Sequence, residues 1–150
     1  MASEVEGRGA GLYERACREM DSGNVLSALS YVEAALKEEQ NTAWYSLYGF
    51  CIAKERGHLK SGLDYCNRAI EADPDNQVHY LFLGRLQLIS GNKPAAIAAL
   101  RQGLQHGGNP QIVKLLHELG TRKPLLFKEL DRNHPTNRYL GKLLSRLGLR

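Results

Sequence analysis

Three short glycine-bearing turns recur along this chain at a constant spacing. Gly23, Gly57 and Gly91 lie 34 residues apart. Two further sets of small residues keep the same spacing: Ala28, Gly62 and Ala96, and Ala35, Ala69 and Gly103. Self-similarity with a fixed period of this length is typical of proteins built from stacked structural repeats. This period constrains the fold more strongly than any other feature of the sequence.

Each repeat contains two amphipathic helices, one on either side of the glycine. In the third repeat, Tyr80 and Leu83 precede Gly91, whereas Ala96 and Leu100 follow it, at the three- or four-residue spacing of a helical face. Glycine suits the end of a helix because the left-handed cap conformation costs it little. The pattern therefore predicts three helix-turn-helix units.

This 34-residue helix-turn-helix period resembles the tetratricopeptide repeat (TPR) family over roughly residues 9–110. The matching residues are Leu83-Gly84, Gly91, Ala96 and Leu100, and Ala69 with Ala72-Asp73-Pro74-Asp75-Asn76. The resemblance implies an all-α fold: a right-handed helix-turn-helix solenoid of three TPR units with C-terminal capping helices. It also implies a scaffold for binding other proteins.

The repeat gives a domain organisation in three parts. Residues 1–8 are expected to form a flexible leader, and residues 9–120 the TPR array. Within the array we expect units at 9–42, 43–76 and 77–110 and an extra helix at 111–119. Residues 121–150 are expected to form a basic loop and a capping helix.

The second unit departs from the pattern in two places. Gly62 stands where alanine is expected, which costs about 0.5–1 kcal/mol in a helix interior. Gly49 lies eight residues before Gly57, whereas Gly84 lies seven before its turn glycine. Either an extra residue lengthens that turn, or Phe50 takes the small-residue position.

The resemblance also implies where a partner binds, because the first helices of such units line a concave groove that receives a peptide. The positions that it points to are Tyr13, Cys17, Met20, Trp44, Leu47, Cys51, Val78, Leu81, Arg85 and Leu88, or in the second unit their neighbours if the register shifts by one. Two alternatives stay open: Tyr13 and Trp44 pack in the core, or the C-terminal segment fills the groove.

Some relatives clamp a C-terminal carboxylate with Lys, Asn and Arg side chains from successive first helices. The positions that match in this chain are Tyr13, Cys17, Tyr48, Val78 and Phe82. Since none of these residues carries a positive charge, such a clamp is not expected here.

Composition favours a cytoplasmic interaction protein over an enzyme. The sequence carries no secretory signal pattern, and its three cysteines, Cys17, Cys51 and Cys66, have no metal-ligand spacing. It also contains no phosphate-binding loop or nucleophile elbow. We therefore expect no catalytic residues, no metal and no cofactor.

The last thirty residues hold 8 Lys and Arg against 2 Asp and Glu, a net charge of +6 in a chain whose overall net charge is +4. Arg138, Lys142 and Arg146 recur every four residues along one edge of a predicted amphipathic helix. We expect this helix to cap the solenoid. The alternative is an accessory factor that binds nucleic acid or a membrane through the basic segment, although neither partner is favoured. Exposed solenoid ends also leave a homodimer open.

Overall fold

The computed structural model describes the backbone of residues 2–120 and of Arg146, with side chains from Gly7 onward. Helices dominate these residues, and no strand occurs among them, so the predicted all-α fold is confirmed. The helices are α1 (Ala2–Asp21), α2 (Val25–Glu38), the 3₁₀ helix η1 (Thr42–Trp44), α3 (Tyr45–Arg56), α4 (Leu59–Ala72), α5 (Gln77–Ile89), α6 (Lys93–Leu104) and α7 (Pro110–Gly120).

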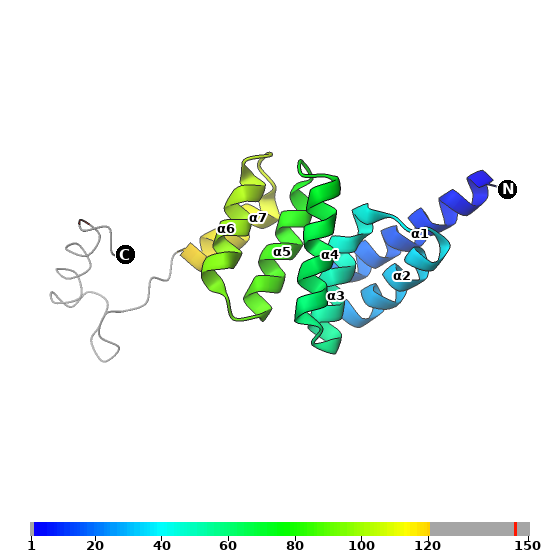
Figure 1. The fold of residues 1–150 in the computed structure, drawn as a ribbon, viewed down its shortest axis with the longest axis horizontal. Coiled ribbons are helices and arrows are strands. Elements are labelled where there is room, and N and C mark those ends of the chain that lie inside the picture. The colour runs from blue at the N-terminus through cyan, green and yellow to red at the C-terminus, as the bar shows by residue number, and fades with distance from the viewer. Residues whose placement is uncertain (1, 121–145, 147–150) are drawn as a thin grey trace. The chain divides into compact units, whose positions relative to one another are not determined.

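The helices pack as successive hairpins, one for each predicted unit (Figure 1). α1 packs on α2, α3 on α4, and α5 on α6, while α3 also contacts α2 and α5. One apolar cluster joins neighbouring units, extending from Ala16 in α1 to Leu86 in α5. A single hairpin cannot bury its apolar face alone, so the stacking of the units provides the core.

The glycines of the 34-residue period end the first helix of each unit in the left-handed conformation. The φ angles of Gly23, Gly57 and Gly91 are +82°, +70° and +76°. Residues with a side chain rarely adopt such angles, which explains why glycine recurs at these positions. The sequence prediction of three glycine turns is therefore confirmed.

The N-terminus differs from the expectation. Residues 2–8, expected in a flexible leader, belong to α1, which begins at Ala2. Gly9 lies against Trp44, where an added Cβ would approach the indole ring to 3.0 Å. Gly9 thus packs closely against the next unit, whereas no atom lies within 4 Å of a Cβ added to Gly7.

The middle unit is held by a backbone-to-backbone contact between α3 and α4. A Cβ added to Gly49 would lie 2.5 Å from the carbonyl oxygen of Gly62, and one added to Gly62 would lie 2.5 Å from that of Gly49. Gly49 therefore takes the small-residue position, and Phe50 does not. Phe50 instead packs against Phe82 of α5, with ring centroids 5.7 Å apart.

A buried polar pair joins α3 to α5. The Ser46 hydroxyl lies 2.8 Å from Nδ1 of His79, and these residues are 0% and 1% exposed. The other ring nitrogen, Nε2, has no hydrogen-bond partner among the described residues. Burial lowers the pKa of His79, and Asp73 opposes this shift only in part. The neutral ring is thus the form that the interface accommodates.

The C-terminal predictions fall largely outside the described residues. α7 occupies the stretch where the extra helix at 111–119 is expected, and its Ile112 is fully buried. Arg138 and Lys142 lie outside the described residues. Arg146 is described as helical and exposed. The capping role of the segment 121–150 therefore stays a prediction.

We predict opposite effects for two glycine-to-alanine changes. Gly62→Ala should destabilise the protein by about 1–3 kcal/mol, because overpacking at the α3–α4 contact outweighs the gain in helix propensity. Gly11→Ala should stabilise it by about 0.5–1 kcal/mol, because no atom lies within 4 Å of the added methyl group. Urea denaturation followed by circular dichroism measures both. A stabilising Gly62→Ala would contradict the assigned contact.

We also predict that Ser46→Ala costs about 1–3 kcal/mol, since it leaves both ring nitrogens of His79 unpaired. The double variant Ser46→Ala/His79→Leu should recover most of that loss.

Because the folded-state pKa of His79 is lowered, the unfolded chain binds a proton first as the pH falls below about 6.5. Wild-type stability should therefore fall below that pH more steeply than that of the double variant. Equal pH profiles would contradict the buried neutral histidine.

Candidate functional site

The residues predicted to line a groove separate into buried and accessible groups. Four of them are core residues, too deeply buried to contact a partner: Trp44 (5% exposed), Leu47 (0%), Cys51 (0%) and Leu81 (3%). Six are partly accessible: Tyr13, Cys17, Met20, Val78, Arg85 and Leu88. Trp44 in η1, Leu47 and Cys51 in α3 and Leu81 in α5 are therefore core residues, and binding along the first helices stays a prediction for the accessible ones.

Packing between the first two units explains the buried group. The Tyr13 ring stacks on Trp44, with centroids 5.3 Å apart and planes inclined by 14°. Burial raises the pKa of Cys51 to about 12, so its thiol stays protonated and packs as a small apolar group. Trp44 thus lies in the core, and Tyr13 is partly buried against it.

Arg85 is a half-buried cation on α5. Its guanidinium lies over the Phe82 ring, 5.6 Å from the centroid, and Nη2 donates to Oε1 of Gln111 in α7 at 3.1 Å. Burial lowers the pKa of Arg85, and Asp21 at the end of α1 partly offsets this effect. No carboxylate among the described residues lies within ion-pair distance of Arg85. We call Val78, Arg85, Leu88 and Gln111 the Arg85 surface, in which the buried Phe82 ring lies under the guanidinium.

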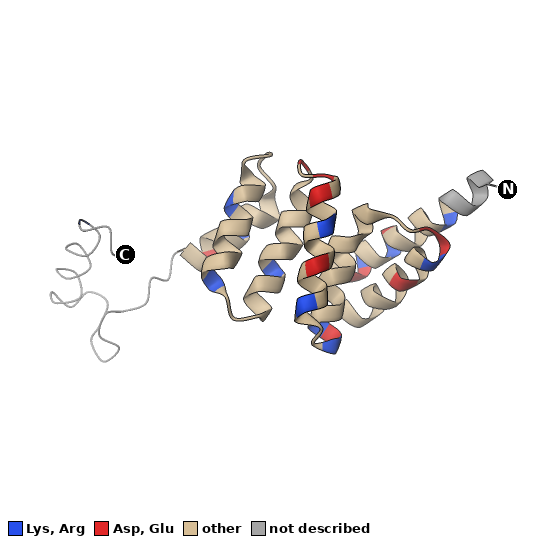
Figure 2. Ribbon diagram, in the orientation of Figure 1, with Lys and Arg blue, Asp and Glu red and all other residues tan. Residues whose placement is uncertain are grey.

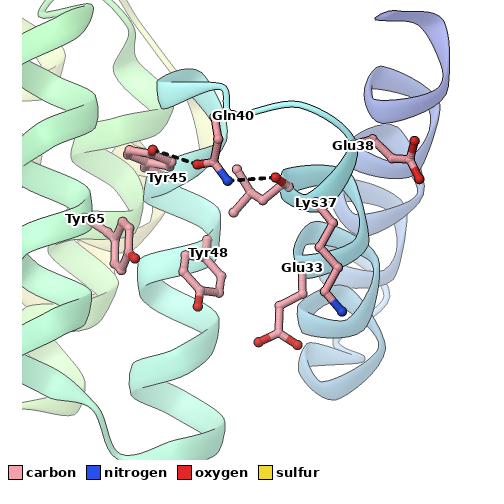
Figure 3. A pocket seen from close by; sticks show the side chains of 8 residues that line it. Glu33, Lys37, Glu38, Gln40, Tyr45, Tyr48 and Tyr65 are labelled. Carbon is pink, nitrogen blue, oxygen red and sulfur yellow. Dashed lines mark hydrogen bonds between the residues drawn. The ribbon is translucent and has the colours of Figure 1, made fainter. Parts of the chain in front are cut away.

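A pocket of about 530 Å³ opens where α2, the following loop, α3 and α4 meet. We call it the tyrosine pocket. Figure 3 shows the tyrosines on one side of it, and Glu33 and Lys37 reaching toward it from α2. The lining residues are Glu33, Leu36, Lys37, Glu38, Gln40, Tyr45, Tyr48 and Tyr65. This volume falls within the range of about 300–1,000 Å³ that is usual for ligand sites.

The three rings of the tyrosine pocket form an edge-to-face cluster. Tyr65 meets Tyr45 at 5.1 Å with an interplanar angle of 79°, and Tyr48 at 4.8 Å with an angle of 73°. These are favourable aromatic geometries. The Arg68 guanidinium lies over the Tyr45 and Tyr65 rings, 4.9 and 5.5 Å from their centroids.

Sequence reasoning missed the tyrosine pocket. It considered Tyr48 only as a possible clamp position or as a neighbour of Leu47 in a shifted register. The three tyrosines come from two helices, and α2 closes the other side. The sequence does show three tyrosines, Tyr45, Tyr48 and Tyr65, in the two helices of the second unit. No sequence spacing predicts that α2 approaches them.

Acidic and basic residues lie side by side on α1, α2, α3 and α4 (Figure 2). The best-formed ion pair joins Arg56 to Glu33 across two units, with nitrogen–oxygen distances of 2.6 and 3.1 Å. Among the described residues, no group of three His, Cys, Asp or Glu side chains could hold a metal ion. Nor does the described part of the chain contain a helix long and apolar enough to span a bilayer.

Comparison with known proteins gives matches only among solved structures. No protein-family profile matches the sequence, and no curated protein matches it. A structure described as the first TPR of Spaghetti (RPAP3) bound to the HSP90 peptide SRMEEVD matches with a TM-score of 0.58 at 12% identity, covering 77% of this chain and 92% of that one.

Two further structures show the same likeness. The Sgt2 TPR domain from Aspergillus fumigatus matches with a TM-score of 0.58 at 15% identity, over 87% of this chain and 93% of that one. The N-terminal domain of stress-induced protein-1 (STI-1) from C. elegans matches with a TM-score of 0.50 at 13% identity, over 77% and 97%. At such identities the likeness establishes the fold.

Proposed function

We propose that this chain, which has the tetratricopeptide-repeat fold, is a protein-interaction scaffold that binds a peptide or helix on the Arg85 surface. The observation that carries the proposal is the half-buried Arg85 guanidinium, which has no carboxylate partner in the described part of the chain. A buried charge is costly unless it is paired. An anionic group of a partner therefore gains more binding free energy at Arg85 than at a fully hydrated cation.

The neighbours of Arg85 favour a peptide ligand. Val78 and Leu88 are partly exposed on the same helix, and the guanidinium packs over the Phe82 ring. Arginine beside aromatic and aliphatic side chains is typical of the residues that dominate binding energy at protein interfaces. The ligand we propose therefore combines an acidic group with adjacent apolar side chains.

The solved structure in complex with the HSP90 peptide shows that a related fold binds an acidic peptide. In this chain the positions that match a carboxylate clamp include Val78 and Phe82, which are uncharged. We therefore propose an acidic peptide centred on Arg85 rather than a clamped C-terminus, with the chain acting as a cytoplasmic adaptor.

Selection of peptides from a random display library against the full chain tests this proposal. The selected peptides should carry an acidic residue and should lose affinity by at least about tenfold on Arg85→Glu. Arg101→Glu on α6 is the matched control, because Arg101 is exposed and makes no ion pair with a described residue. It should leave binding unchanged.

Thermal denaturation of both variants separates lost binding from lost folding. Selected peptides that bind wild type and a folded Arg85→Glu variant equally would contradict the proposal. So would selected peptides without acidic residues.

A further inference from the structure

The wall of the tyrosine pocket carries a lysine that no acidic group of the described chain neutralises. Lys37 reaches toward the pocket from α2, and Tyr48 and Tyr65 lie on the other side (Figure 3). Its ammonium group makes no ion pair and no hydrogen bond with any described residue. Lys37 is therefore available to pair with an anion.

The two carboxylates that line the pocket, in contrast, already face cations. Glu33 accepts hydrogen bonds from both terminal nitrogens of Arg56, at 2.6 and 3.1 Å. The Glu38 carboxylate lies 4.0 Å from Nε of Arg8. Among the described residues, Lys37 is thus the charged group of the lining that has no counter-charge. The unbalanced charge of the pocket is positive.

A second cation at the tyrosine rings argues against a cationic ligand. A cluster of aromatic rings can bind an organic cation over the ring faces. Here the Arg68 guanidinium already occupies that position, 4.9 and 5.5 Å from the centroids of Tyr45 and Tyr65. Another cation would be repelled by both Arg68 and Lys37. These two charges favour an anionic ligand.

Two phenol hydroxyls add neutral hydrogen-bond donors to this positive charge. Those of Tyr48 and Tyr65 make no hydrogen bond with any described residue, and both residues are half-buried. Burial raises the pKa of Tyr48, so its hydroxyl keeps its proton at neutral pH and can donate. The Tyr45 hydroxyl already donates to Oε1 of Gln40 at 3.2 Å. The pocket therefore offers an ammonium group and two phenol donors to the oxygens of an anion.

The surfaces beside these donors are aromatic. Tyr65 meets Tyr45 and Tyr48 edge to face, with centroid distances of 5.1 and 4.8 Å. One further ring can extend this arrangement, since edge-to-face contacts are favourable for aromatic groups. The volume of about 530 Å³ is large enough for a ligand with a single ring.

We propose that the tyrosine pocket binds an aromatic anion, a ring that bears a carboxylate or a phosphate group. Lys37 pairs with the anionic group, Tyr48 and Tyr65 donate hydrogen bonds to its oxygens, and the ligand ring packs against the tyrosine rings. This site is separate from the Arg85 surface and does not depend on the function proposed for that surface.

Titration of the isotope-labelled full chain with phenylacetate and with phenyl phosphate, followed by amide chemical shifts at constant ionic strength, tests the proposal. Saturable shifts should centre on the α2 residues of the pocket and on Tyr48 and Tyr65. The tighter of the two ligands identifies the anionic group as carboxylate or phosphate. Benzylamine, which has the opposite charge, and hexanoate, which has no ring, should each bind at least about threefold more weakly.

Variants of Lys37 test the role of its charge. Lys37→Gln removes the charge and keeps a long polar side chain, so it should weaken binding of the tighter ligand by about threefold to tenfold. Lys37→Arg keeps the charge and should retain most of the affinity. Lys60→Gln on α4 is the matched control and should bind like wild type. Lys60 is exposed, lies outside the pocket and makes no ion pair with a described residue.

The absence of saturable shifts in the pocket up to about 10 mM of either ligand would overturn the proposal, because a ligand with a single ring should bind in the millimolar range. Benzylamine or hexanoate that binds as tightly as the aromatic anions would contradict it too, as would unchanged affinity in a folded Lys37→Gln variant. Arg85→Glu should leave the shifts unchanged, and their loss in that variant would assign the anion to the Arg85 surface instead.

Discussion

The contact between the Gly49 and Gly62 backbones sets how closely α3 and α4 approach, and much of the array depends on it. Neither position tolerates a side chain at this separation, because an added Cβ would lie 2.5 Å from the opposite carbonyl oxygen. The close approach brings neighbouring side chains of α3 into contact with the units on either side. Leu47 and Cys51 of α3 are fully buried, and Phe50 packs against Phe82 of α5.

This burial divides the accessible surface into two separate regions. α3 is buried from Tyr45 to Ala53 except at Tyr48, which is half-buried in the tyrosine pocket. The partly accessible residues of α5 form the other region around Arg85. One region offers phenol hydroxyls and aromatic rings, and the other offers a half-buried cation beside apolar side chains.

The sequence predicted the repeat, the glycine turns and the helical hairpins because each depends on local spacing and on the conformational freedom of glycine. The sequence did not predict the features that depend on packing between units. The extra residue between Gly49 and Gly57 changes which side chains of α3 face outward, since one residue turns a helix by about 100°. Cys51 is consequently buried although Arg85, 34 residues later, is partly accessible, and Tyr48 lines a pocket. That pocket also requires α2, whose contribution follows from tertiary packing.

The central claim is that the α3–α4 hairpin holds the array together, and native-state hydrogen exchange tests it most directly. Local stability varies along a repeat array, and the best-packed unit opens last. If this hairpin holds the array together, the slowest-exchanging amides of the intact chain lie in α3 and α4, and their exchange requires global unfolding. Slower exchange in α1 or α6 than in α3 and α4 would contradict it.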